Sequence, residues 1–409
     1  MSNPDDLRRL RWGAVLTCIS SLVAACGGGD NNPAGPGSTE PTDVGEAPTP
    51  GCRDGVLPHG ALYRLCLPES WNGDLVLYAH GYVAPQQELA IPEDVVGGRP
   101  ASDLITSLGY GYATTSYRAN GLIAPEAVED LIELSEEVQR LIRPDPNRSV
   151  VVGFSEGGLV ATLSAELHPD RFNGALAGCG PIGDFRAQLD YIDDFRVVFD
   201  YFFPGLLPGT ALEIPESVRQ QWESVYIPAI VVALAARPDA TRQLLAVTRA
   251  PTAGSDLRSI AETTVGLLWY NVFGTADGQA RLGGNPFDNS GRTYSGSDDD
   301  ATLNAGVERF VADADALASL ERFSTSGNLT VPLINLHTTG DPIVPFSQAG
   351  LYAEKVRQLG TDGLYTQTDV ARPGHCTFEA AELLSAFTTL WQQIDARTLV
   401  TAMDLAAHP

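Results

Sequence analysis

The chain of 409 residues is poor in positive charge: Lys355 is its single lysine, and 51 acidic residues oppose 26 basic ones. The resulting net charge of −25 at pH 7 repels phosphates, which argues against nucleic acid as a partner. The sequence also lacks a glycine-rich phosphate loop, a dinucleotide fingerprint and any metal-ligand spacing of histidine and cysteine. We therefore expect the protein to need no cofactor and no metal.

The apolar run at the N-terminus, residues 12–25, is too short to span a bilayer as a stable helix. It follows a basic segment, residues 8–11, and this arrangement is typical of an export signal. The run ends in Val23-Ala24-Ala25-Cys26, which resembles a bacterial lipobox. That resemblance implies cleavage after residues 1–25, acylation of Cys26 and stable membrane anchoring. In lipoproteins, Gly27 after the cysteine favours the outer membrane; the alternative is an ordinary secretory signal with an incidental cysteine.

Residues 26–51 are rich in Gly, Pro, Asn, Ser and Thr and have too few apolar side chains to pack. We expect a flexible tether that holds a catalytic region away from the membrane. The rest of the chain is long enough to bury a large core and to contain two domains.

The most informative motif is Gly153-Phe154-Ser155-Glu156-Gly157. A valine-rich run precedes it and a helix-like segment, residues 158–168, follows it. Strand, tight turn and helix form the context that a G-x-S-x-G nucleophile elbow requires. The glycines permit close approach of helix and strand, so the serine hydroxyl can project from the sheet. We predict that Ser155 is a nucleophile.

A serine nucleophile needs a base, and the base needs an acid that orients it. The elbow architecture places them in the chain order serine, acid, histidine. We predict His375 as the base because it follows the last strand-like segment. We predict Asp341 as the acid because it follows the apolar run 331–337, at the edge where open parallel sheets place their sites. The alternatives are His337, which we expect to be an ordinary residue near a strand end, and Asp369, which lies inside a strand pattern.

A further buried strand, residues 74–79, ends in His80-Gly81-Tyr82. Small residues at such a position let backbone N–H groups face the cavity. We predict that the N–H groups of Tyr82 and Glu156 hold the oxyanion, and that the His80 imidazole only shapes the loop.

Four motifs together resemble an α/β-hydrolase of the esterase and lipase kind: Gly153-Phe154-Ser155-Glu156-Gly157, Gly340-Asp341, Gly374-His375 and His80-Gly81. The resemblance implies an α/β-hydrolase fold, with an eight-stranded, mostly parallel, doubly wound sheet, and serine-based cleavage of esters or related acyl bonds. We place this core over residues 52–183 and 329–409.

Residues 184–328 match no motif, but in this superfamily an insertion at this place usually forms a helical cap over the serine. Helical patterns cover much of it: 215–225, 226–236, 239–248, 254–273 and 299–323. Its aromatic residues either line an apolar pocket or form the core of the cap. The acidic loop 288–300 does not match a calcium-binding spacing, so we expect a solvated loop, and calcium stays an open alternative.

Four cysteines remain after the signal peptide and Cys26 are set aside, an even number suited to an oxidising compartment. Three pairings are possible. We favour Cys52–Cys66, because residues 55–60 can turn the chain between them, and this leaves Cys179–Cys376. Four free thiols are the alternative. Tannases and feruloyl esterases also have a cysteine beside the histidine, but their second cysteine adjoins the serine, where this chain has Phe154.

Three functional hypotheses follow. The first is an exported serine hydrolase, lipid-anchored in the bacterial cell envelope, that cleaves small-molecule or polymeric carboxylic esters. The second is an aminopeptidase-like peptidase on the same triad, which aminoacyl-anilide cleavage without ester turnover would reveal. The third is a binding lipoprotein on an inactive hydrolase scaffold, which a fluorophosphonate would not label.

Overall fold

The computed structural model describes residues 49–96 and 98–407. The predicted signal peptide, the predicted acylation site at Cys26 and most of the predicted tether lie outside these residues. No helix in the described ranges combines the length and the apolar character needed to cross a bilayer.

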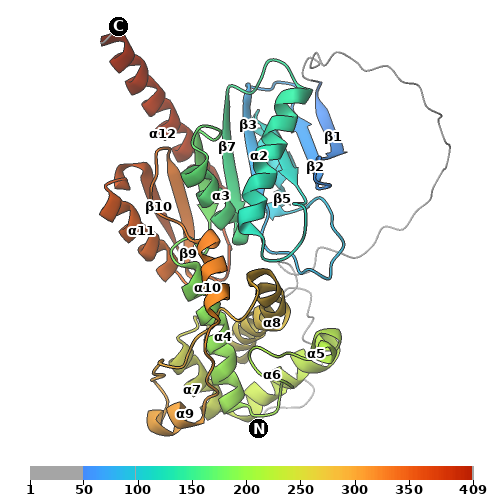
Figure 1. Cartoon of the computed structure of the whole chain (residues 1–409), viewed down its shortest axis with the longest axis vertical. Coiled ribbons are helices and arrows are strands. Elements are labelled where there is room, and N and C mark those ends of the chain that lie inside the picture. The colour runs from blue at the N-terminus through green and yellow to red at the C-terminus, as the bar shows by residue number, and fades with distance from the viewer. Residues whose placement is uncertain (1–48, 97, 408–409) are drawn as a thin grey trace, which may run out of the picture. The chain divides into compact units, whose positions relative to one another are not determined.

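Eight strands form one sheet in the order β1-β2-β6-β3-β7-β8-β9-β10 (Figure 1). Strand β2 runs antiparallel to both of its neighbours, and all other neighbours are parallel. A separate two-stranded ribbon consists of β4 (Val95–Val96) and β5 (Arg99–Pro100). The strands of the large sheet are β1 (Gly51–Val56), β2 (Leu62–Leu67), β3 (Asp74–Ala79), β6 (Gly111–Thr115), β7 (Arg148–Phe154), β8 (Gly174–Gly178), β9 (Leu333–Gly340) and β10 (Tyr365–Pro373).

Helices cover both faces of this sheet, and the side chains of β3 show why its sequence is apolar throughout. Leu75 and Leu77 belong to one core, and Val76 and Tyr78 belong to the core on the opposite face. The first core is covered by α2 (Ala124–Leu141), α3 (Glu156–Leu167) and α11 (Ser347–Leu359), and the second by α1 (Ala101–Ser107) and α12 (Ala380–Ala407). A short 3₁₀ turn, η5 (Asp362–Leu364), precedes β10. The fold is that of an α/β-hydrolase, as the sequence predicts.

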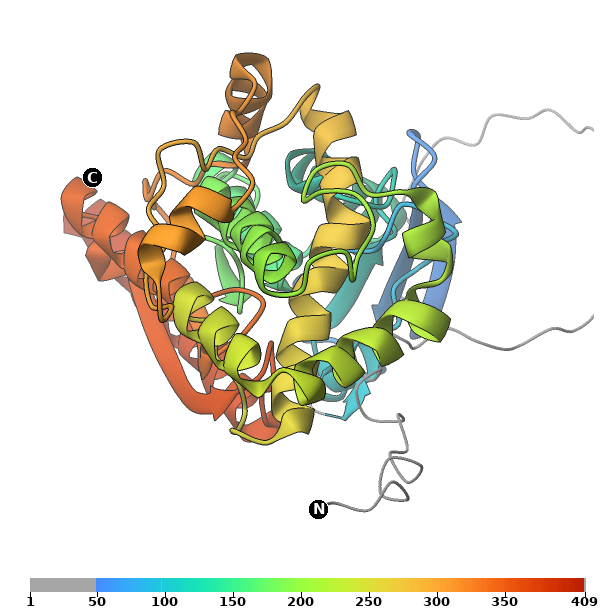
Figure 2. The same cartoon turned by 90° about the horizontal axis from the view of Figure 1, so that it is seen from below.

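The segment between β8 and β9 is helical and packs around an apolar core of its own. Figure 2 shows the molecule from below, with this segment nearest the viewer. Helices α4 and α8 lie side by side in front of the sheet. Its elements are α4 (Phe185–Phe202), α5 (Glu216–Gln220), the π-helical turn η3 (Trp222–Tyr226), α6 (Ile227–Ala236), α7 (Pro238–Thr248), α8 (Leu257–Leu282), α9 (Asp300–Gly306), α10 (Ala314–Leu320) and the 3₁₀ turn η4 (Glu321–Phe323). We call this segment, residues 184–328, the insertion.

One expected helix of the insertion is wrong: residues 299–323 form two helices with an extended segment between them. The buried side chain of Asn289 accounts for the break. Its Oδ1 accepts the N–H of Phe310 at 2.7 Å, and its Nδ2 donates to the carbonyl of Glu308 at 2.9 Å. Because a side chain satisfies these backbone groups, the segment needs no helical hydrogen bonds there.

Candidate active site

Ser155 lies at the sharp turn between β7 and α3. Its backbone has φ 58° and ψ −126°, a strained conformation for a residue with a side chain. A Cβ atom at Gly157 would lie 2.0 Å from the carbonyl oxygen of Ala79, and one at Gly153 would lie 2.1 Å from that of Gly157. Both glycines are therefore required by the close approach of α3 to the sheet, and this turn has the form of a nucleophile elbow.

The structure brings together the three side chains that the sequence analysis assigns to the triad. His375 Nε2 lies 2.9 Å from Ser155 Oγ, and His375 Nδ1 lies 2.7 Å from Asp341 Oδ2. An ionised carboxylate can only accept a hydrogen bond, so Nδ1 carries the proton and Nε2 is free to accept the serine hydroxyl. Each residue lies in a loop that follows a parallel strand, so the three meet at one edge of the sheet.

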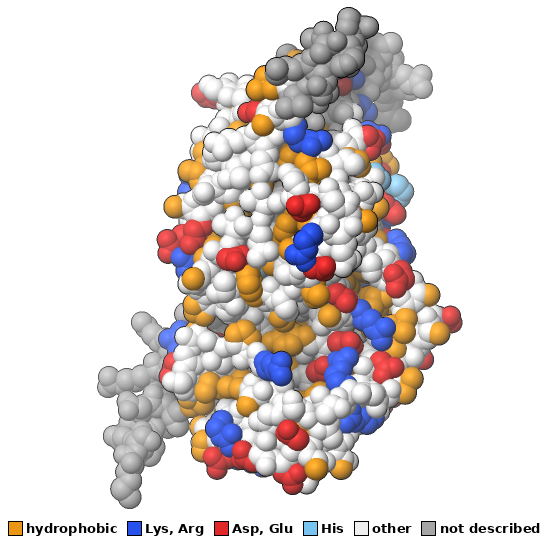
Figure 3. Space-filling model, turned by 90° about the vertical axis from the view of Figure 1, so that its left-hand side faces the viewer, with side chains coloured by type: hydrophobic (Ala, Val, Ile, Leu, Met, Phe, Trp, Pro, Cys, Tyr) orange, Lys and Arg blue, Asp and Glu red, His pale blue; other side chains and the backbone are white. Residues whose placement is uncertain are grey.

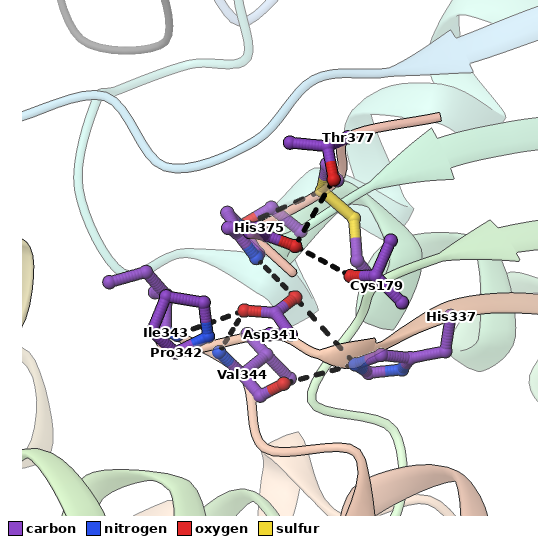
Figure 4. Close-up of polar contacts among 12 residues, drawn as sticks. Cys179, His337, Asp341, Pro342, Ile343, Val344, His375 and Thr377 are labelled. Atoms are coloured by element: carbon purple, nitrogen blue, oxygen red, sulfur yellow. Dashed lines mark hydrogen bonds and ion pairs between the residues drawn. A yellow bond between two sulfur atoms is a disulfide. The ribbon is translucent and has the colours of Figure 1, made fainter. Parts of the chain in front are cut away.

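Asp341 is fully buried and both of its oxygens are occupied (Figure 4). While Oδ2 faces His375, Oδ1 accepts the N–H groups of Ile343 at 2.9 Å and Val344 at 3.0 Å. The alternative acid, Asp369, is exposed on β10, where it accepts a hydrogen bond from a neighbouring glutamine. Asp341, and not Asp369, is therefore the carboxylate that contacts the histidine.

His337 lies beneath the Asp341 loop and does not bond to Ser155. Its Nε2 lies 3.0 Å from the carbonyl oxygen of Val344 and 3.7 Å from Asp341 Oδ2. Burial lowers the pKa of His337, so the ring is neutral and donates its single N–H from Nε2. His337 thus contributes to holding the loop, a contact that its place near a strand end did not reveal.

The loop after β3 lies against the nucleophile. A Cβ atom at Gly81 would lie 3.4 Å from Ser155 Cβ, so this loop passes directly beside the serine. No described residue accepts a hydrogen bond from the amide of Tyr82 or of Glu156. His80 donates from Nδ1 to the carbonyl of Gly81 at 2.7 Å and stacks on Tyr117 with ring centres 4.0 Å apart. The arrangement leaves two backbone donors near Ser155 and uses the imidazole of His80 within the loop.

A mainly apolar cavity of about 90 Å³ adjoins Ser155 between the sheet and the insertion. Phe185, Leu189 and Ile192 of α4 line one side, and Tyr270 of α8 lines another. Figure 3 shows one face of the molecule, on which hydrophobic side chains gather across the middle. A cavity of this composition suits an apolar group attached to the carbonyl that Ser155 would attack.

Two buried carboxyl groups also line the cavity. Burial raises the pKa of Glu156 to about 8 and that of Asp193 to about 7. Glu156 Oε1 accepts the N–H of Ile123 at 3.0 Å, and Asp193 Oδ1 accepts from Asn271 Nδ2 at 2.8 Å. Burial therefore favours the neutral form of both carboxyl groups. No sequence signal distinguished either carboxyl as a cavity residue.

Two disulfides are present, with the pairing that the sequence analysis favours. Cys52–Cys66 joins paired positions of β1 and β2, and Cys179–Cys376 joins the end of β8 to the residue after His375. Among the described residues, Cys179, His375 and Cys376 are the only group of three potential metal ligands, and two of them form this disulfide.

The acidic side chains of the loop 288–300 are engaged in contacts with other protein groups. Asp288 accepts from Ser290, and Asp298 pairs with Arg242. Asp299 caps α9 by accepting the N–H of Thr302 at 3.0 Å, and Asp300 accepts from Ser297. The contacts of Asp288, Asp299 and Asp300 are turn and helix-cap contacts, whereas that of Asp298 is an exposed ion pair with α7.

No protein-family model and no curated protein sequence matches this chain. Among solved structures, similar ones include feruloyl esterase B from Aspergillus oryzae, with 15% identity, a TM-score of 0.49, and coverage of 78% of this chain and 72% of that one. An esterase from Pyrococcus furiosus has 13% identity and a TM-score of 0.40, over 86% of this chain and 91% of its own. Acylaminoacyl peptidase from Pyrococcus horikoshii has 13% identity and a TM-score of 0.39, over 79% of this chain but only 37% of its own length. At these identities the likeness concerns the fold alone.

Proposed function

We propose that this protein is a serine hydrolase that cleaves carboxylic esters through an acyl-enzyme. The observation that carries the proposal is the hydrogen-bonded series Ser155 Oγ, His375 Nε2, His375 Nδ1 and Asp341 Oδ2, with separations of 2.9 and 2.7 Å. A strained elbow and an adjoining apolar cavity support the same assignment.

The reaction follows from the directions of these hydrogen bonds. Ser155 Oγ attacks the acyl carbon while His375 Nε2 takes its proton, and Asp341 stabilises the imidazolium that forms. The amides of Tyr82 and Glu156 donate to the alkoxide, and the imidazolium then protonates the departing alcohol. Water, activated by the same His375 Nε2, attacks the acyl-enzyme and releases the acid.

The test is Ser155→Ala with p-nitrophenyl esters. Turnover should fall by about 10⁴-fold or more, because the nucleophile is absent. A melting temperature close to that of the wild type would show that the protein remains folded. Turnover in the variant within tenfold of the wild type would refute the assignment.

The cavity favours esters over peptides with a free amine. The lining of the cavity is mainly apolar, so burying an ammonium group there costs free energy unless a carboxyl group ionises to pair with it. We expect p-nitrophenyl esters with short apolar acyl groups to be cleaved at least tenfold faster than the corresponding aminoacyl anilides. The reverse order would favour the peptidase.

We also propose that the protein is exported and lipid-anchored in the cell envelope through Cys26. The support is the sequence of residues 8–26, which lies outside the described structure. Metabolic labelling with a fatty acid should mark the wild type but not Cys26→Ala. Equal labelling of both proteins would exclude this attachment site.

A further inference from the structure

The loop after Asp341 is bound by side chains at three successive carbonyl groups. Tyr191 Oη donates to the carbonyl of Pro342 at 2.9 Å, and Gln188 Nε2 donates to that of Ile343 at 2.8 Å. The third, that of Val344, accepts the N–H of His337 described above. Two of the three donors belong to α4 and thus to the insertion.

The side chains of the same loop also pack into the insertion. Ile343 and Val344 are 9% and 3% exposed, and both belong to the apolar core of the insertion and not to the cores beside the sheet. A Cβ atom at Gly266 of α8 would lie 3.1 Å from Ile343 Cδ1. The insertion therefore holds the loop in two ways: it donates hydrogen bonds to the backbone of the loop, and it packs against the side chains of the loop.

Helix α4 is in turn fixed to the sheet domain where it begins. Gln348 of α11 accepts the N–H groups of Gly183 and Asp184 through Oε1, at 2.8 and 2.7 Å. Its Nε2 donates back to the carbonyl of Asp184 at 2.8 Å. Asp184 itself caps α4 by accepting the N–H of Ala187. The start of α4 therefore has a defined position relative to the strand ends.

The position of this loop bears on the proposed reaction because the same loop supplies two hydrogen bonds to Asp341. The N–H groups of Ile343 and Val344 hold Oδ1, which leaves Oδ2 directed at His375. Any movement of the loop carries these two amides, and the carboxylate with them. A displacement of a catalytic group by about 1 Å can reduce a rate roughly 10²-fold.

We propose that Tyr191 and Gln188 of α4 are positioning residues that hold Asp341 against His375. The insertion then completes the triad in addition to covering the cavity. This inference rests on the proposed serine hydrolase function, but the hydrogen bond it concerns can be observed without any substrate.

The test combines kinetics with proton NMR of the full-length chain. Tyr191→Phe removes only the donor to Pro342, and Tyr191→Phe with Gln188→Met removes both donors from α4. Tyr201→Phe is the matched control, because Tyr201 lies on the same helix and its hydroxyl bonds to no described residue. The NMR readout is the downfield proton of His375 Nδ1–H, assigned by its loss in His375→Gln.

In Tyr191→Phe we expect kcat to fall about threefold to tenfold, the range that one lost hydrogen bond gives, with KM within twofold. The downfield proton should exchange faster, and the double variant should show a larger change in both readouts. Tyr201→Phe should match the wild type.

Several outcomes would overturn the proposal. One is a double variant with kcat within twofold of the wild type and an unchanged downfield proton. Another is a change in KM alone, which would assign α4 to substrate binding only. Absence of the downfield proton from the wild type would mean that the bond to be positioned does not persist in solution. A different outcome separates this proposal from the proposed function. A wild type without esterase activity, but with a downfield proton that the variants lose, would refute the proposed function and support the positioning role.

Discussion

Asp341 illustrates how backbone donors can fix the chemistry of one side chain. Because two amides occupy Oδ1, an asparagine at this position would keep its oxygen there and direct its NH₂ group at His375 Nδ1. Nδ1 would then have to accept, so the proton would move to Nε2, the atom that must accept the serine hydroxyl. Asp341→Asn should therefore lower kcat by about 10⁴-fold with little change in KM.

Steady-state kinetics on p-nitrophenyl esters would measure this effect. Asp369→Asn is the matched control, since Asp369 is exposed and lies on the neighbouring strand. A larger loss of turnover in the control than in Asp341→Asn would assign the role of the orienting acid to Asp369.

Glu156 allows a second prediction at the scale of a residue. Burial, opposed mainly by the hydrogen bond from the N–H of Ile123, raises the pKa of its carboxyl from 4.5 to about 8. Between these values the unfolded chain loses this proton while the folded chain retains it, so stability falls as pH rises. Glutamine retains an oxygen for the N–H of Ile123 but cannot ionise. From pH 5 to pH 8, the wild type should therefore lose on the order of a few kcal/mol relative to Glu156→Gln.

Urea unfolding of both proteins at the two pH values would measure the difference. Other buried carboxyl groups, such as that of Asp193, are present in both proteins, so their contribution to the pH dependence of stability cancels in the comparison. If the free energies of unfolding of the two proteins changed in parallel between the two pH values, the carboxyl of Glu156 would have an ordinary pKa in the folded protein.

At the scale of an element, the junction of β7 and α3 depends on the lack of a side chain at Gly157. An added methyl group would lie 2.0 Å from the carbonyl oxygen of Ala79, which is backbone and cannot yield. Gly157→Ala should therefore destabilise the protein by roughly 3 kcal/mol or more and lower its melting temperature.

Gly350→Ala in α11 is the matched control, because a Cβ atom there would meet nothing within 4 Å. The same substitution in this helix should leave stability unchanged or raise it by about 0.5–1 kcal/mol. Similar melting temperatures for the two variants would show that the elbow tolerates a wider separation of helix and strand.

The elements of the sheet could be predicted from the sequence because buried parallel strands are locally distinctive. The run at 74–79 coincides with β3, and the helix-like segment at 158–168 overlaps α3 (Glu156–Leu167). Helix α4 was missed, although Asp184 precedes it as an N-cap residue and apolar side chains recur at helical spacing from Phe185 to Phe202. The break between α9 and α10 could not be predicted, since it depends on a buried asparagine from another loop.

The candidate site, too, could be predicted from the sequence only in part. The elbow and the chain order singled out Ser155, Asp341 and His375, and the structure places their side chains within hydrogen-bonding distance. Their catalytic roles stay predictions. The contacts of Gln188 and Tyr191 with the Asp341 loop depend on packing between segments about 150 residues apart, which no local pattern encodes.

At the scale of the whole molecule, the two disulfides close loops of very different length. Cys52–Cys66 spans 14 residues within one hairpin, whereas Cys179–Cys376 spans 197 residues that include the insertion, β9 and β10. In the chain-entropy model the longer loop restricts the unfolded chain more, so its bond should stabilise by about 5 kcal/mol and the hairpin bond by about 3 kcal/mol. Double alanine variants of each pair, compared by urea unfolding, would measure this order.

Turnover should separate the two variants further, because only the longer cross-link adjoins the histidine. Cys376 follows His375 directly, and its bond to Cys179 fixes that loop to the end of β8. Loss of this bond should lower kcat, whereas loss of Cys52–Cys66, at the far edge of the sheet, should leave kcat within about twofold of the wild type at a temperature where both variants are folded. Equal loss of turnover in the two variants would mean that the disulfides act through global stability alone. A selective loss in the Cys179 and Cys376 variant would mean that the covalent bond between β8 and β10 restrains the histidine from one side, as α4 restrains the aspartate from the other.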